Sequence, residues 1–286
     1  MKSASAEASS ATTTAGLLHI PPKLLPVERS TTHTPLLEKA QETIFYLAYG
    51  SNLCSATFLG RRGIRPLSSI PVRVPELTLT FSLPGIAYLE PCFANVSFTE
   101  NPDPSWWKGG LIGVVYEVTQ SDFAKILATE GGGTAYQIRS VTAVTLEGGK
   151  TIDAKTLLAP LARERHSGAQ PSKRYLDLIR TGARQHSLPE DYREWLEGLQ
   201  DYKRTTMGQK IGGALWAASW LPFVFGIMFL SRTFADKEGR APGWVSTVQT
   251  TMGKVMWAVY DNVFKHIWGD GERAVEEDRG RERVRL

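Results

Sequence analysis

The chain has 286 residues, enough for one or two domains, and its hydrophobic fraction of 42% and charged fraction of 22% are ordinary for a globular protein. The net charge is only +4, and lysines and arginines are scattered among acids, so the charge does not favour nucleic acid as a partner. The two cysteines, Cys54 and Cys92, lack metal-site spacing and make no disulfide scaffold. A reducing, cytoplasmic compartment is the default expectation, and a single disulfide between them stays open.

Both ends of the chain have compositions that are typical of unfolded segments. Residues 1–40 begin with Ser, Thr and Ala, contain no apolar core of a secretory signal and have few arginines for a transit peptide. They predict a flexible leader. Residues 270–286 are dense in Glu, Asp and Arg and predict a solvated, charged tail. A folded domain is expected between these ends, over residues 41–202.

The first element of this domain carries the most informative motif. An apolar run from Ile44 to Ala48 predicts a buried strand that breaks directly into Tyr49-Gly50-Ser51-Asn52-Leu53. Gly50 allows the backbone to approach a ligand closely, and the N–H groups that follow can point into one concavity. Such a loop can hold a carboxylate or an oxyanion, although the five residues alone are equally consistent with an ordinary turn.

The elements that follow predict a mixed fold. Strands are expected over residues 77–81, 93–98 and 111–118, and the last of these is apolar and β-branched, hence central. Thr119 to Asp122 has the form of a helix N-terminal cap, and the helix must end at Gly131-Gly132-Gly133. Two more strands (136–146 and 152–158) and two helices (172–184 and 189–199) complete the order. This order predicts an α+β fold with a mixed or barrel-like sheet.

Glu130 is the residue that we expect to perform chemistry. It lies at the end of the predicted helix, and the negative pole of a helix is an unfavourable place for a carboxylate. A glutamate whose charged form is disfavoured by its position can take and return protons near neutral pH. A solvated glutamate at a frayed helix end is the alternative, and position alone favours it.

Other kinds of chemistry have no support in the sequence. There is no Ser-His-Asp arrangement, no G-x-S-x-G motif and no glycine loop of the kinds that bind phosphates or dinucleotides. The five histidines are not paired at ligand spacing, and each is better explained as structural or exposed. We therefore expect neither a metal nor a cofactor.

Four motifs in order resemble the γ-glutamylcyclotransferase family over about residues 43–200. The loop after the first strand is similar to the substrate loop of that family, and Glu130 with Tyr136 is similar to its catalytic glutamate and a pocket tyrosine. The remaining resemblance lies in Gly113-Val114-Val115-Tyr116, Pro171-Ser172-Lys173-Arg174-Tyr175, Gly182-Ala183 and Leu188-Pro189-Glu190-Asp191-Tyr192.

The resemblance implies a β-barrel of about six strands with flanking helices. It also implies a cofactor-free reaction that converts a γ-glutamyl compound into 5-oxoproline and a free amine. Glu130 would carry the proton from the α-ammonium to the leaving nitrogen. The backbone N–H groups of Gly50, Ser51, Asn52 and Leu53 would hold the substrate and the oxyanion, while Tyr49 and Tyr136 would shape the pocket.

Departures from the family pattern keep other readings open. The family often has a further tyrosine where this chain has Leu157-Leu158-Ala159, and Arg163-Glu164-Arg165-His166 reads as an insertion. A larger γ-glutamyl adduct would suit a pocket changed in this way. The alternatives are a non-catalytic binding or membrane-anchored module of the same fold, and a hydrolase that releases glutamate.

Residues 203–269 predict a helical extension. The run from Ile211 to Leu230 has no charge and would span roughly 30 Å, a bilayer core. The stretch from Trp244 to Trp268 predicts an amphipathic helix that lies on a membrane or packs on the first helix. The alternative to membrane association facing the cytosol is a soluble helical hairpin. Such a hairpin would cover the domain or the partner subunit of a homodimer.

Some fungal members of the family have a similar polar leader and a long C-terminal extension. They are linked to sulfur-containing secondary metabolites that are made through glutathione adducts. This resemblance implies a glutathione-derived γ-glutamyl adduct as the substrate.

Overall fold

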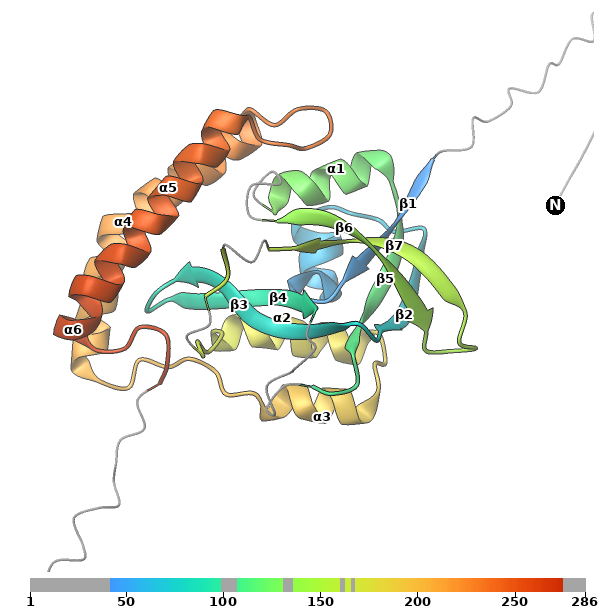
Figure 1. Cartoon of the computed structure of the whole chain (residues 1–286), viewed down its shortest axis with the longest axis horizontal. Coiled ribbons are helices and arrows are strands. Elements are labelled where there is room, and N and C mark those ends of the chain that lie inside the picture. Colours follow the sequence, from blue (N-terminus) through green and yellow to red (C-terminus); the bar gives the residue numbers. More distant parts are fainter. Residues whose placement is uncertain (1–41, 99–106, 131–135, 160–162, 166–167, 275–286) are drawn as a thin grey trace, which may run out of the picture. The chain divides into compact units, whose positions relative to one another are not determined.

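The computed structural model of the chain describes residues 42–98, 107–130, 136–159, 163–165 and 168–274 (Figure 1). The predicted leader, the three glycines after Glu130 and residues 275–286 lie outside the described residues. The described residues belong to one compact unit, which joins the predicted domain and its helical extension.

Five strands close into a barrel in which each strand is hydrogen-bonded to its neighbours. Their order is β1 (Thr43–Ala48), β5 (Leu111–Thr119), β2 (Ser68–Val74), β6 (Gln137–Thr145) and β7 (Thr151–Leu158). The pairs are antiparallel except that β1 meets β7 in parallel. The apolar, β-branched strand β5 is buried along most of its length, as a central strand should be. The predicted α+β fold with a mixed barrel is therefore confirmed, with five barrel strands where about six were expected.

A separate sheet of two strands accounts for the rest of the β-structure in the described ranges. It pairs β3 (Leu77–Ile86) with β4 (Glu90–Phe98). Tyr88, in the turn between them, has a φ of 63°, and its N–H donates to the Gly271 carbonyl at 2.7 Å. The tip of this hairpin is thereby attached to the C-terminal part of the chain.

Three helices flank the barrel, and the N-terminal cap predicted at Thr119 is confirmed. α1 (Gln120–Thr129) begins where the Thr119 side chain accepts a hydrogen bond from the Asp122 N–H at 3.1 Å, and Glu130 is its C-cap. α2 (Lys173–Gln185) is capped by Ser172 and buries an apolar face, and α3 (Glu190–Gly198) follows after a short connection. The C-cap position fixes where the Glu130 side chain leaves the helix.

The extension forms two long helices that lie side by side (Figure 1). The first is α4 (Met207–Thr233); the second runs through α5 (Gly243–Val259), a π-helical turn (Tyr260–Phe264) and α6 (Lys265–Trp268). Gly212 permits a close approach, since a Cβ there would lie 2.4 Å from Cβ of Trp268. We call this pair of helices the C-terminal hairpin.

The C-terminal hairpin contacts the barrel part of the chain at several places, among them Trp216 of α4 and the loop between α4 and α5. Trp216 of α4 is fully buried, with ring contacts to Tyr88 and Tyr260 at centroid distances of 6.4 and 6.0 Å. In the loop between α4 and α5, Gly239 has a φ of +78°, and a Cβ there would lie 2.0 Å from the Ala124 carbonyl oxygen of α1. The hairpin therefore contacts the helix that ends at Glu130.

Candidate active site

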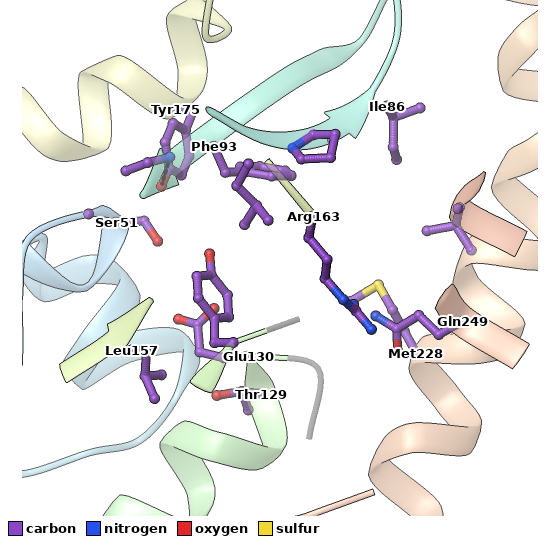
Figure 2. Close-up of a pocket in the computed structure, with 18 of the residues that line it drawn as sticks. Ser51, Ile86, Phe93, Thr129, Glu130, Leu157, Arg163, Tyr175, Met228 and Gln249 are labelled. Carbon is purple, nitrogen blue, oxygen red and sulfur yellow. Dashed lines mark hydrogen bonds between the residues drawn. The ribbon is translucent and has the colours of Figure 1, made fainter. Parts of the chain in front are cut away.

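A cavity of about 620 Å³ lies between the barrel and the C-terminal hairpin (Figure 2). One end is lined by the predicted loop and acid: Tyr49, Gly50, Ser51, Asn52, Glu130 and Tyr136. The other end is lined by α4 and α5, through Val224, Met228, Gln249, Met252 and Trp257 among others. The cavity therefore has a polar end on the barrel and a largely apolar end on the hairpin. Its volume is within the usual range for small-molecule sites.

The loop after β1 forms a short 3₁₀ turn over Ser51–Leu53. Gly50 permits the turn to lie against its neighbours, because a Cβ there would be 3.1 Å from the Tyr175 hydroxyl oxygen. Leu53 differs from the prediction. Its side chain is fully buried, it does not line the cavity, and its N–H donates to the Gly50 carbonyl at 3.0 Å. Leu53 therefore stabilises the loop and does not contact a ligand in the cavity, because its N–H is used inside the tight turn.

The Glu130 carboxylate lies beside this loop and is held by two donors. Its Oε1 accepts from Nδ2 of Asn52 at 3.1 Å and from Nη2 of Arg62 at 2.5 Å. Arg62 also donates to the Thr129 hydroxyl. The side chains of Arg62 and Glu130 are 10% and 20% exposed, so solvent only partly screens the pair. Both contacts involve Oε1, and Oε2 has no hydrogen-bond partner among the residues that the structure describes.

Of the two pocket tyrosines, Tyr49 is buried and Tyr136 is partly buried. The Tyr49 hydroxyl donates to the Leu157 carbonyl, at the position where the family often has a further tyrosine. Burial raises the pKa of Tyr49 and of Tyr136, and the nearby Glu130 charge raises the pKa of Tyr136 further. Both residues therefore remain protonated at neutral pH and can act as walls and donors.

Several polar residues of the cavity were not singled out as site residues from the sequence, among them Arg62, Tyr175 and Arg163. Arg62 follows a π-helical turn (Ala56–Arg61) that no pattern indicated. Tyr175 belongs to the Pro-Ser motif that was recognised, and its hydroxyl accepts from the Ala94 N–H at 3.1 Å, near Ser51 in Figure 2. Arg163 lies in the segment interpreted as an insertion, and it points across the cavity to the Thr250 hydroxyl of α5. Only Tyr175 had a usable signal in the sequence.

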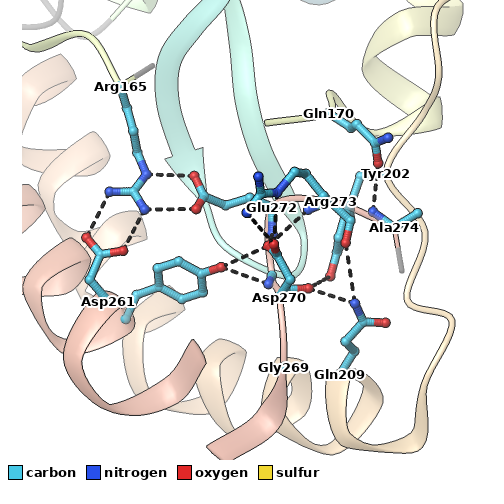
Figure 3. A network of polar contacts seen from close by, with 12 residues as sticks. Arg165, Gln170, Tyr202, Gln209, Asp261, Gly269, Asp270, Glu272, Arg273 and Ala274 are labelled. Carbon is cyan, nitrogen blue, oxygen red and sulfur yellow. Dashed lines mark hydrogen bonds and ion pairs between the residues drawn. The ribbon is translucent and has the colours of Figure 1, made fainter. Parts of the chain in front are cut away.

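A network of polar contacts fastens the C-terminal hairpin beside the cavity (Figure 3). Arg165 makes two hydrogen bonds to Asp261, at 2.6 and 2.8 Å, and two to Glu272, also at 2.6 and 2.8 Å. Its guanidinium also lies 4.3 Å from the ring centroid of Trp257. Glu272 is fully buried, and Asp270 accepts from the Glu272 N–H at 2.8 Å. The predicted solvated tail is thus corrected at Gly271 and Glu272, which are buried, and Arg165 neutralises the Glu272 carboxylate.

Both cysteines are free and buried, so the disulfide that the sequence left open is not formed. Among the residues that the structure describes, no cluster of His, Cys, Asp and Glu could hold a metal ion.

Two family models match the chain, one to each of its parts. The AIG2-like family model matches residues 110–196, and the AclK C-terminal domain model matches residues 206–267. The first range contains Glu130, and the second contains most of the C-terminal hairpin.

Individual relatives match the chain over longer ranges than either family model does. The chain is 34% identical over 245 residues to gamma-glutamyl cyclotransferase gliK of Aspergillus fumigatus, covering 80% of this chain and 89% of that protein. It is 30% identical over 247 residues to gamma-glutamyl cyclotransferase aclK of Aspergillus oryzae, covering 80% and 90%. The gamma-glutamylcyclotransferase of Bos taurus is 25% identical over 165 residues, or 57% of this chain and 82% of that protein.

A solved structure named gamma-glutamyl cyclotransferase is 22% identical with a TM-score of 0.47, covering 61% of this chain and 99% of that chain. Because this score lies below 0.5, family membership rests on the sequence relatives. Identity of 30% or more across about nine-tenths of two fungal relatives shows that the chain belongs to the γ-glutamyl cyclotransferase family.

Proposed function

We propose that the protein is a γ-glutamylcyclotransferase that releases 5-oxoproline and a free amine, with Glu130 as the general acid and base. The observation that carries this proposal is the Glu130 carboxylate beside Asn52 at the polar end of the cavity. The names of the fungal relatives support the same activity. The alternative of a non-catalytic module would gain support if Glu130 faced away from the loop or a side chain separated them, whereas Asn52 of the loop contacts Glu130 directly.

The reaction needs no added water in this proposal. Glu130 takes a proton from the substrate α-ammonium, and the free amine attacks the γ-carbonyl carbon of the same molecule. The carbon–nitrogen bond to the leaving amine then breaks as Glu130 returns this proton to the leaving nitrogen. The attacking nitrogen loses a second proton when it becomes the lactam N–H, and Glu130 passes this proton to the released amine as well, which departs as an ammonium. Because the attack is intramolecular, positioning supplies much of the rate. The N–H groups at Gly50, Ser51 and Asn52 would face the substrate and the developing oxyanion.

The two oxygens of Glu130 divide this work. Asn52 and Arg62 both donate to Oε1, which fixes the plane of the carboxylate. Oε2 is the atom that we assign to proton transfer. A fixed base with one committed oxygen is pre-organised for both transfers, because it need not reorient between them.

The size and character of the cavity support a leaving amine larger than a single amino acid. The hairpin end adds apolar side chains such as Met228, Met252 and Trp257 to the polar end at Glu130. A glutathione-derived γ-glutamyl adduct has the required form, with a charged γ-glutamyl end and a bulky group on sulfur.

The test is 5-oxoproline formation from γ-glutamyl dipeptides, glutathione and glutathione S-conjugates. We expect product with the wild-type chain and a loss of at least a hundredfold in kcat in Glu130→Gln. Glu76→Gln, at an exposed glutamate in the turn before β3, is the matched control. Full activity in Glu130→Gln would remove Glu130 from the mechanism. If folded wild-type protein forms no product from any of these substrates, the binding module is favoured. If the product is glutamate, the protein is a hydrolase.

We further propose that the outer face of α4 attaches the enzyme to the cytosolic surface of a membrane. Within the described residues, α4 is the one helix that is long and apolar enough to cross a membrane, by length and composition alone. Its outward positions include Ile211, Leu215, Phe225 and Phe229, which are 43–68% exposed. Exposed lysines and arginines, Lys210, Arg232, Lys237 and Arg240, lie near its ends and suit anionic headgroups. Trp216 of the same helix is fully buried and Met228 lines the cavity, so α4 also packs against the rest of the chain, which supports attachment in place of crossing.

Co-sedimentation with phosphatidylserine-containing vesicles tests this attachment. We expect the double variant Phe225→Ser/Phe229→Ser to lose most vesicle binding and to keep its fold. Leu67→Ser, at an exposed apolar residue of the barrel part, should bind vesicles like the wild type. The attachment would be contradicted if the wild type did not bind vesicles and eluted as a dimer while the double variant eluted as a monomer. This face of α4 would then bind a second copy of the chain.

A further inference from the structure

Arg163 differs from three other arginines that line the cavity, each of which has an acidic partner. Arg62 is paired with Glu130, Arg165 with Asp261 and Glu272, and Arg174 with Glu90 at 2.7 Å. Arg163 contacts the Thr250 hydroxyl, a neutral group, and the described part of the chain gives it no acidic partner. A guanidinium that is partly removed from water without a counter-ion is costly.

The position of Arg163 indicates what could provide that counter-ion. Its side chain extends across the cavity between the end at Glu130 and the end at Met228 and Gln249 (Figure 2). Thr250 holds the guanidinium there, and the Thr250 hydroxyl in turn donates to the Ser246 carbonyl at 2.8 Å, within α5. Burial lowers the pKa of Arg163, as expected for a cation without a partner. An anionic group on a bound ligand would offset this cost.

The proposed reaction determines which part of the ligand reaches Arg163. This step rests on the proposed function. The α-amine and the γ-carbonyl of the glutamyl group must lie at Glu130, so the leaving amine extends toward the hairpin. Arg163 lies on that path, and a guanidinium binds a carboxylate through two parallel hydrogen bonds. We infer that Arg163 is a specificity-determining residue that binds a carboxylate carried by the leaving amine.

This assignment gives the C-terminal hairpin a part in substrate selection. α5 contributes Thr250, which positions the guanidinium, and both helices line the space around it. A chain without the hairpin would keep Glu130 and the loop but would lose this selection. The preferred substrates are accordingly γ-glutamyl peptides whose leaving part ends in a free carboxylate.

The experiment compares pairs of γ-glutamyl dipeptides that differ only in a C-terminal carboxylate or carboxamide. We expect the wild type to prefer the acid at least tenfold in kcat/KM. Arg163→Gln should lower kcat/KM for the acid by about ten- to a hundredfold, mainly through KM, and leave the amide unchanged. Arg163→Lys should retain part of the preference. Arg139→Gln, at an exposed arginine of β6 that does not line the cavity, is the matched control.

Binding is measured separately by calorimetry on the Glu130→Gln background, so that the result does not depend on turnover. Tighter binding of the acid that Arg163→Gln removes would support the inference even if no 5-oxoproline formed, in which case the proposed function alone fails. Equal losses for acid and amide would overturn the inference, because Arg163 would then act on a part common to both. Product formation without any preference for the acid would also overturn it.

Discussion

Asn52 donates to Oε1 of Glu130 at 3.1 Å and to the Tyr46 hydroxyl at 2.9 Å, although Asn52 and Glu130 lie 78 residues apart. This contact joins the end of β1 to the end of α1. The guanidinium of Arg62 approaches the same carboxylate oxygen from the turn after the loop. The orientation of the proposed base, Glu130, is therefore set by Asn52 and Arg62, which both lie near the start of the domain in the sequence.

Replacing Arg62 by Ala should lower kcat by about ten- to a hundredfold, because a charge-assisted hydrogen bond that holds the base is lost. KM should change less, since the substrate contacts proposed for the loop remain. Steady-state 5-oxoproline release checks this expectation, with thermal unfolding to verify the fold. Arg61→Ala, at the neighbouring exposed arginine, is the control. An unchanged kcat in Arg62→Ala would mean that Asn52 alone suffices to orient the base.

Gly182 of α2 should be intolerant of any side chain, because a Cβ there would lie 2.4 Å from the backbone carbon of Leu53. In Gly182→Ala the 3₁₀ turn must move away from α2, which displaces Asn52 from Glu130. We expect a loss of stability of about 1–3 kcal/mol and a tenfold or greater loss of activity. Gly198→Ala, where nothing lies within 4 Å of the added Cβ, should be nearly neutral. Urea unfolding and the cyclisation assay measure both effects. Equal behaviour of the two variants would show that this close contact has no role.

Local patterns predicted most elements of the barrel part. The runs that became β1 and β5 and the cap at Thr119 carry their signal within a few residues, so their positions follow from short windows. The strand β2 was missed, since Pro71 within a run argues against a strand interior. The site was predicted in the same way: Gly50 and Glu130 stand in recognisable motifs.

The rest of the site depends on how distant elements meet. Arg163 reaches the cavity only because α5 supplies Thr250, and no periodicity in the sequence indicates that pairing. The predicted apolar face of the second extension helix is also split. Val245 is buried while Val248 and Val263 are exposed. The π-helical turn that begins at Tyr260 changes the number of residues per turn, so a face drawn at 3.6 residues per turn does not continue through it to Val263. The exposure of Val248, which precedes this turn, has no such explanation.

Glu272→Gln should destabilise the attachment of the C-terminal hairpin. The substitution removes the charge of a fully buried carboxylate that faces Arg165, and the loss from breaking a buried pair is on the order of 3 kcal/mol. A lower melting temperature and faster proteolytic cleavage within the hairpin are the expected readouts. Activity should also fall, because α4 and α5 line the cavity. Glu238→Gln, at an exposed glutamate between those helices, is the control. A variant with wild-type melting and proteolysis would indicate that Asp261 alone holds Arg165.

His186 should make stability depend on pH in the acidic range. Its Nε2 lies 2.7 Å from the Tyr116 hydroxyl, and burial lowers the pKa of His186 in the folded state. On acidification the unfolded chain therefore binds a proton at this residue before the folded chain does, beginning near the ordinary value of about 6.5. Stability should consequently be full above that pH, fall as the pH drops below it, and level off below the folded-state pKa.

Urea unfolding at several pH values between 7.5 and 5 checks this expectation in the wild type and in His186→Gln. The variant should lose the part of the pH dependence that His186 contributes, whereas His266→Gln, at an exposed histidine, serves as the matched substitution. Identical pH dependence in the wild type and His186→Gln would contradict the prediction. The buried tyrosine–histidine contact would then hold the turn at Asn52, whose carbonyl accepts from Tyr116 at 3.3 Å, without any titration.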